Sequence, residues 1–249
     1  MTHIERPLEE AGFNQSPIYE GVDLYLSDAP LRRAMALAGV DDAAAKLSEC
    51  GRAWGSAQAL DEGRVANDNP PVLRQVDPKG FRIDRVEFHP AYHALMARSV
   101  AQGLHASAFA PGATARDFIA RGARLYMAVQ AEAGHMCPIT MTHAVVPALA
   151  AAPEIAARWA PKIHSRLYDP SQRPWWEKSG VTFGMGMTER QGGTDVRANI
   201  SRAETAGDHY EITGHKWFMS APMCDAFLVL AQAKGGLTCF LIPRHRPDG

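Results

Sequence analysis

The residue pattern of this chain changes near residue 180, and this change constrains the fold more than any other feature. Before that point, apolar residues recur at helical spacing between connections rich in Pro and Gly. After it, short runs of strand composition alternate with turn signals such as Ala206-Gly207-Asp208. Helices followed by strands predict an α+β fold rather than an alternating parallel one. We expect an N-terminal arm and all-α helical domain over 1–180 and an antiparallel β-domain, incomplete at its end, over 181–249.

Capping signals and apolar spacing predict the helices of the first half. Ser27 or Asp28 can cap a helix over 30–39. Two further helical faces follow from spacing. They are Leu47, Cys50, Trp54 and Ala57, and then, after Pro90 as the first helical residue, Tyr92, Leu95, Met96, Ser99, Val100 and Gly103.

A capping box predicts one longer helix. Thr114 with Asp117 three positions later resembles this motif, with Asp in place of Glu, and opens a helix through about Gly134. Pro138 is expected to stop it. Short alanine-rich helices are predicted across 140–160.

Several segments have strand composition. The charged stretch Arg82–Phe88 interrupts the helical half. In the second half the predicted strands are 181–185, 198–204, 209–213, 215–219, 225–232 and 237–242. A sheet that ends with the last of these has an unpaired edge, which natural proteins normally cover or blunt. We therefore expect the chain to be cut short.

Composition limits the classes of partner. With 26 basic and 27 acidic residues the net charge is −1, which gives no overall electrostatic reason to bind nucleic acid or an anionic membrane. A hydrophobic fraction of 46% excludes a disordered chain. No apolar stretch approaches membrane-spanning length, and no signal peptide is recognisable. The four cysteines lack C-x-x-C pairing, which favours free thiols and a cytoplasmic location.

The segment with the strongest chemical character is the glycine-rich stretch Gly184–Ala198. Exposed amides and hydroxyls after a strand could cradle a phosphate or the polar edge of a heteroaromatic ring. Glu189 stands where a Rossmann fingerprint needs Gly or Ala, and the Gly-Lys-Ser/Thr of a Walker loop is absent. A tight turn between strands is an equally good interpretation of this spacing.

The second such segment is Gly214–Ser220, which we expect to be a strand. Alternation would place Phe218 and Ser220 on one face, and Trp217 and Met219 on the other. An aromatic face beside a hydroxyl suits a flat ring with a polar edge. Aromatic residues on strands more often belong to the core, and the spacing alone favours that alternative.

No catalytic or metal-binding residue is predicted from spacing. His135, Cys137 and His143 have metal-ligand side chains, but Pro138 intervenes and no second carboxylate is near in sequence. We expect these residues to form core and pocket wall. A G-x-S-x-G nucleophile elbow is also absent.

Together the two segments resemble the flavin motifs of the acyl-CoA dehydrogenase family. Met187–Asp195 is similar to its M-T/S-E-x-x-x-G-S/T-D signature, and Lys216–Ser220 is similar to its K-x-W/F-I-T/S element. Further segments resemble the AidB-type, alkylation-response branch of that family, and the resemblance extends over essentially the whole chain. These segments are Phe13-Asn14-Gln15, Leu24–Asp28, Ala66–Pro71, Phe88–His93 and Cys137–Thr142.

For the site, the resemblance implies bound FAD. Thr188 would bond the polar edge of the isoalloxazine, Thr194 would reach the pyrophosphate, and Ser220 would lie near flavin N5, the atom that accepts hydride. Phe218 would pack on the ring. The complete implied set is Met185, Met187, Thr188, Gly193, Thr194, Phe218, Met219 and Ser220.

For function, the resemblance implies an oxidoreductase of the DNA alkylation response, with at most weak acyl-CoA dehydrogenase activity. The resemblance also implies an acyl-CoA dehydrogenase-like fold that is truncated, with its C-terminal helical bundle absent. The catalytic glutamate would belong to that missing domain, so no catalytic residue is assigned. The implied partners are FAD, acyl-CoA, double-stranded DNA through that missing domain, and further copies in a homotetramer. Two alternatives stay open: a DNA-binding protection protein with a structural flavin, and an inactive fragment or assembly module.

Overall fold

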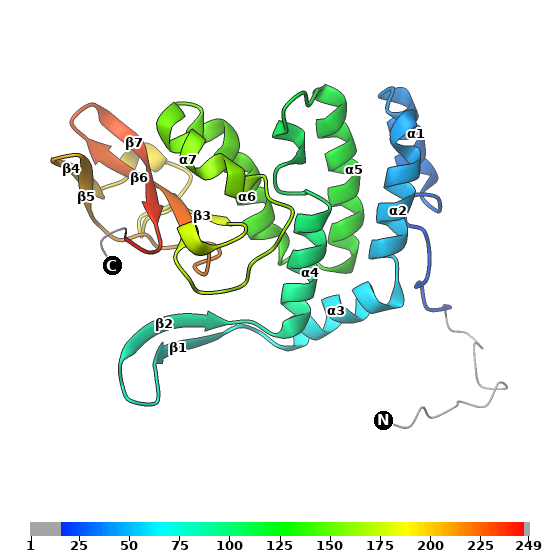
Figure 1. The fold of residues 1–249 in the computed structure, drawn as a ribbon, viewed down its shortest axis with the longest axis horizontal. Helices are drawn as coiled ribbons and strands as arrows, with labels where there is room; N and C mark the ends of the chain where they lie inside the picture. Colours follow the sequence, from blue (N-terminus) through cyan, green and yellow to red (C-terminus); the bar gives the residue numbers. More distant parts are fainter. Residues whose placement is uncertain (1–15, 247–249) are drawn as a thin grey trace.

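A computed structural model describes residues 16–246, so Phe13-Asn14-Gln15 lies outside the described residues. The helices are α1 (Ala29–Leu37), α2 (Ala44–Trp54), α3 (Ala57–Asp68), α4 (Pro90–Ala101), α5 (Ala115–Ala131), α6 (Met136–Leu149) and α7 (Pro153–Ile163). The strands are β1 (Val72–Val76), β2 (Arg82–Glu87), β3 (Phe183–Gly186), β4 (Arg202–Ala206), β5 (His209–Thr213), β6 (Ala226–Ala233) and β7 (Gly236–Pro243). Helices α1, α2, α4 and α5 stand side by side, while α6 and α7 lie next to the larger sheet (Figure 1). This arrangement confirms the α+β fold class.

Three predicted helix starts are confirmed by their capping groups. The Asp28 carboxylate accepts the N–H of Leu31 at 2.8 Å and begins α1. Thr114 and Asp117 form the predicted capping box of α5. Pro90 is the first residue of α4, where its missing N–H would have no helical partner in any case.

The prediction that Pro138 stops a helix is wrong. Helix α5 ends at Ala131, and the carboxylate of Glu132 accepts the N–H groups of Gly134 and His135. Helix α6 then begins at Met136, so Pro138 lies in its first turn, where N–H groups have no intrahelical partner. The proline therefore marks a helix start rather than an end.

The helical face predicted from Leu47 to Ala57 is divided between two helices. Helix α2 ends at Trp54, and the Ser56 hydroxyl caps α3 by accepting the N–H of Ala59 at 3.2 Å. A Cβ on Gly55 would lie 2.1 Å from the carbonyl oxygen of Val22. Gly55, between α2 and α3, therefore allows the Val22 segment to approach the chain closely. The spacing of apolar residues cannot reveal such a contact.

The projecting hairpin was predicted only in part. Strand β2 corresponds to the predicted segment 82–88, whereas β1, which pairs with it antiparallel, was not anticipated. The Asp77 carboxylate organises the turn by accepting the N–H groups of Lys79 and Phe81 at 2.8 and 2.9 Å. Because β1 is exposed along its whole length, it lacks the alternation that identifies a half-buried strand.

The larger sheet is mixed rather than purely antiparallel. Strand β6 pairs with β3 in parallel and with β7 antiparallel, and β4 and β5 form an antiparallel hairpin. The parallel pair is possible because a long excursion, which includes that hairpin, separates β3 from β6. Within residues 16–246, β7 pairs only with β6. The predicted strand 198–204 begins later, at Arg202, after a short 3₁₀ turn over Val196–Ala198.

Two hydrophobic clusters hold these elements together. The first lies among the helices and includes Trp54, Leu95 and Met127. The second joins α6 and α7 to β3 and β6, with Trp159 stacked on Trp175 at 4.0 Å between ring centroids. This cluster contains residues from both sides of residue 180. The division into domains 1–180 and 181–249 therefore stays a prediction.

A buried polar chain joins α4 to the start of α6. Ser99 Oγ lies 2.9 Å from His135 Nε2, and His135 Nδ1 lies 2.8 Å from the Glu132 carboxylate. Ser99 and His135 are fully buried. Their hydrogen bonds therefore stabilise the helical core, as expected for His135.

Protonation of Glu132 is expected to destabilise the fold in acid. Burial opposes its charge, but hydrogen bonds from the His135 side chain and from the backbone of His135 and Gly134 outweigh burial and lower the pKa of Glu132 from 4.5 to about 2. Because the pKa is lower in the folded state, the stabilisation is present above pH 4.5 and disappears as the pH falls toward 2. Between these pH values, the free energy of urea unfolding should decrease by roughly 1–3 kcal/mol more in the wild type than in Glu132→Gln.

The control is Glu204→Gln, at an exposed position on β4, which should keep the wild-type pH profile. Parallel profiles for the wild type and Glu132→Gln would contradict this role of Glu132.

Candidate functional site

The structure brings the two predicted motif segments together. Met185 of β3 forms an isolated antiparallel bridge with Ser220. The N–H of Trp217 donates to the carbonyl oxygen of Thr188 at 3.0 Å. Residues 185–188 and 217–220 therefore lie side by side.

The predicted strand 215–219 is wrong. This segment is irregular, and only Ser220 takes part in a β-bridge. Trp217 and Phe218 each expose 64% of their surface, so the core interpretation of these aromatic residues is also wrong. The segment is held by a few long-range contacts rather than by a ladder of backbone hydrogen bonds, and its side chains do not alternate between two faces.

The strongest of these contacts is an ion pair between Glu189 and Lys216. The Glu189 carboxylate is 1% exposed, and its Oε1 lies 2.8 Å from Lys216 Nζ. The same carboxylate accepts the N–H groups of Ile200 at 2.7 Å and Ser201 at 3.0 Å, and the side-chain amide of Gln191 at 3.0 Å. It thus binds three separate segments to one another.

The electrostatics of Glu189 favour its charged form. Burial alone would raise its pKa, but the hydrogen bonds from Lys216, Ser201, Ile200 and Gln191 outweigh burial and hold the pKa well below the usual value. A buried carboxylate is stable only when it is paired and hydrogen-bonded in this way. In the sequence, Glu189 is a mismatch to the Rossmann fingerprint and the Glu of the M-T/S-E signature, and neither pattern predicted that it pairs with Lys216. The missed signal was an acid in one motif and a lysine at the start of the next.

Two glycines allow the close approaches at this site. A Cβ on Gly193 would lie 2.5 Å from Thr188 Oγ1, and one on Gly186 would lie 2.2 Å from Met219 Sδ. Asn199 also donates its side-chain amide to the carbonyl oxygen of Met187 at 3.0 Å. Thr188 and Met219 therefore take these positions because Gly193 and Gly186 have no side chain.

None of the eight residues implied to bind FAD is fully buried. Gly193, Thr194 and Phe218 are exposed, and the other five are partly buried. Within the described chain, no hydrogen bond involves the side-chain hydroxyls of Thr188, Thr194 and Ser220. The exposed ring of Phe218 and the available hydroxyls of Thr188 and Ser220 lie on adjoining segments, and this combination fits a large planar cofactor with polar edges.

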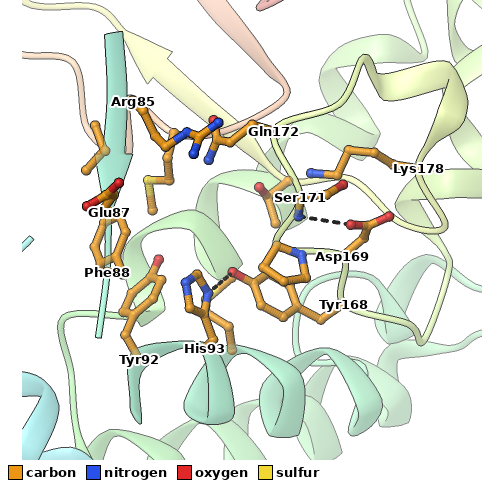
Figure 2. A pocket seen from close by; sticks show the side chains of 15 residues that line it. Arg85, Glu87, Phe88, Tyr92, His93, Tyr168, Asp169, Ser171, Gln172 and Lys178 are labelled. Carbon is orange, nitrogen blue, oxygen red and sulfur yellow. Dashed lines mark hydrogen bonds between the residues drawn. The ribbon is translucent and has the colours of Figure 1, made fainter. Parts of the chain in front are cut away.

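A different set of residues lines a pocket of about 360 Å³ (Figure 2). Its walls come from β2, the start of α4 and the segment 168–172, with Lys178, Thr182 and Met223 completing them. None of the eight residues lines it. The molecule therefore has two distinct candidate sites.

Comparisons with known proteins identify the family of the chain. The family model described as the N-terminal domain of adaptive response protein AidB matches residues 14–170. The model described as the acyl-CoA dehydrogenase middle domain matches residues 184–249. The AidB protein of Escherichia coli K12 is 44% identical over 239 residues, which cover 95% of this chain and 44% of that protein.

Solved structures give the same result for the fold. The apo form of Bd2924 has a TM-score of 0.80 at 27% identity, and covers 96% of this chain and 49% of its own. Caenorhabditis elegans ACDH-11, solved in complex with C11-CoA, has a TM-score of 0.80 at 26% identity, and the corresponding coverages are 96% and 42%. The chain spans less than half the length of each of these relatives. It belongs to the acyl-CoA dehydrogenase family, in the branch defined by the AidB N-terminal domain.

Proposed function

We propose that this chain supplies the flavin-binding surface of an AidB-type flavoprotein. The observation that carries the proposal is the junction of residues 185–188 with 217–220, which gathers the hydroxyls of Thr188 and Ser220 beside the exposed ring of Phe218. FAD, when bound, supplies redox chemistry by accepting a hydride at N5. This chain's own residues bind and orient that group.

Each residue has a distinct role in this proposal. The Thr188 and Ser220 hydroxyls bond the polar edge of the isoalloxazine, and Thr194 reaches the pyrophosphate. Phe218 packs on the ring, which is a large apolar surface. The four remaining members of the set, Met185, Met187, Gly193 and Met219, line the surface, where methionine adapts well to an aromatic partner.

For the whole protein, we propose an acyl-CoA substrate and a role in the response to DNA alkylation. Support for the substrate class comes from ACDH-11, whose structure contains C11-CoA. Dehydrogenation needs a base within hydrogen-bond reach of the proton removed, and we assign no residue of this chain to that role. The activity is therefore a proposal about the longer protein.

Two further partners are proposed, double-stranded DNA and further copies of this chain. The net charge of −1 gives the chain no overall electrostatic attraction to DNA, so we propose that DNA binds through a part of the longer protein outside this chain. A homotetramer is supported by the free edge of β7 and by the exposed apolar residues Val72, Leu73 and Val76 on β1. A cytoplasmic location remains a prediction. In the described residues, no helix is both long and apolar enough to span a membrane.

Removal of the available hydroxyls should weaken FAD binding. Thr188→Val and Ser220→Ala each remove one hydrogen bond to the cofactor, so each should raise the FAD dissociation constant roughly tenfold. The measurement is titration of the purified protein with FAD, followed by flavin fluorescence. Thr213→Val, at an exposed position on β5 outside the site, should bind like the wild type. Absence of FAD binding by the wild type, or equal loss in all three variants, would contradict the proposal.

Separation of Glu189 from Lys216 should destabilise the protein and release FAD. Lys216→Met leaves the Glu189 carboxylate buried without its cation, and the expected cost is about 3–5 kcal/mol of unfolding free energy. Glu189→Gln leaves the lysine unpaired, and the double variant should lose less than the sum of the two singles. Urea unfolding and retained flavin absorbance are the two measurements.

The matched control is the exposed pair Arg64–Asp61, with side chains 62% and 64% exposed. Asp61→Asn should change stability by less than about 1 kcal/mol and leave FAD bound. Additive losses in the Glu189–Lys216 cycle would show that the pair is not coupled.

A further inference from the structure

The pocket between the hairpin and α4 has the size of a small-molecule site. Its volume of about 360 Å³ falls within the range of roughly 300–1,000 Å³ that is usual for ligand pockets. Figure 2 shows the aromatic side chains of Phe88, Tyr92 and Tyr168 along one side and Arg85 with Gln172 opposite them. The pocket thus combines an apolar wall with a polar rim.

The apolar wall is built from stacked rings. Phe88 and Tyr92 stack with their centroids 4.0 Å apart, and His93 stacks on Tyr168 at 5.9 Å. A hydrogen bond of 2.9 Å between His93 Nδ1 and Tyr168 Oη fixes the second pair. Rings held in this way present a flat apolar surface that suits another aromatic ring.

Two buried polar atoms of the pocket have no partner in the described chain. They are Tyr92 Oη and Gln172 Oε1. An unsatisfied buried polar atom costs about 1–3 kcal/mol, so a ligand that bonds both atoms recovers this free energy. Burial raises the pKa of Tyr92, and its hydroxyl is therefore a hydrogen-bond donor at neutral pH, whereas the Gln172 oxygen can only accept.

The charge of the rim points to an anion. Three of the charged residues in the lining are engaged by opposite charges, whereas Arg85 has no acidic partner within residues 16–246. The three existing pairs are Glu87–Arg74 at 3.0 Å, Asp169–Arg173 at 3.4 Å and Lys178–Asp225 at 2.7 Å. An available guanidinium at the rim favours a carboxylate, which it can bind with two parallel hydrogen bonds.

We propose that this pocket binds a small aromatic carboxylate whose ring carries a hydrogen-bond donor, such as a phenolic hydroxyl. The ring packs against Phe88 and Tyr92, the carboxylate binds Arg85 and the Tyr92 hydroxyl, and the donor bonds Gln172 Oε1. An aliphatic acid would leave the Gln172 oxygen unsatisfied and would not use the stacked rings. The site shares no residue with the proposed flavin surface and does not depend on it.

Calorimetric titration of the purified protein with 4-hydroxycinnamate tests this proposal. Three probes each lack part of this ligand: 4-hydroxycinnamyl alcohol lacks the carboxylate, cinnamate lacks the ring donor, and octanoate lacks both the ring and its donor. Each is expected to bind at least about fivefold more weakly than 4-hydroxycinnamate, in line with the loss of one buried contact. No binding of 4-hydroxycinnamate, or equal binding of all four probes, would overturn the proposal.

Variants locate the site. Arg85→Gln should weaken 4-hydroxycinnamate binding about tenfold, which corresponds to one charge-assisted hydrogen bond. Tyr92→Phe keeps the stacked ring and should cause a smaller loss. Arg82→Gln, on the same strand but outside the pocket, should bind like the wild type. Equal effects of the Arg85 and Arg82 changes would refute the assignment.

The same titration in the presence of saturating FAD separates the two sites. Unchanged affinity is expected, because the pocket and the flavin surface have no residue in common. Competition between FAD and 4-hydroxycinnamate would show that the ligand occupies the flavin surface, and would overturn the proposal.

Discussion

The motif surface depends on one buried carboxylate. The Glu189 side chain is 1% exposed, and a carboxylate buried to this degree stays charged only when hydrogen-bond donors surround it. The donors come from Gln191, Ile200, Ser201 and Lys216. To meet this requirement, the glycine-rich loop folds back on the segment after it, and Lys216 places residues 217–220 beside β3. The hydroxyls of the surface are thus positioned by an interaction in which they take no part.

Helix α6 places β3 itself. Its residue Ile139 belongs to the helical cluster and Val145 to the cluster shared with the sheet. Between them, the Thr142 hydroxyl accepts the N–H of Phe183, the first residue of β3, at 2.9 Å. The helix therefore fixes both the position and the beginning of the strand that leads into the motif loop. Together with α7, this helix joins the helical half to the sheet.

Local signals in the sequence were sufficient at three helix starts, where the partner group lies within one turn, but they failed at Pro138, which lies in a first turn and does not stop a helix. The caps at Asp28 and Thr114 and the first-turn proline Pro90 satisfy backbone groups of their own helix, and all three were predicted. The flavin motifs could be recognised as sequences, but their contact with each other could not. Prediction also failed where a group distant in sequence determines the local structure. The Val22 carbonyl lies beside Gly55, where one predicted helical face is divided between two helices. The Glu189 carboxylate binds Lys216, and the segment 215–219 is irregular rather than a strand.

The two candidate sites differ in what a ligand can gain from them. On the flavin surface the hydroxyls are open to water, so each bond to a cofactor replaces a bond to water and contributes only about 0.5–1.5 kcal/mol. Tight binding there requires many contacts over a large ligand, which agrees with a surface assembled from two segments. In the pocket, Tyr92 Oη and Gln172 Oε1 are already removed from water. A small ligand can bind there through few contacts, because the cost of burying these groups has been met by the fold.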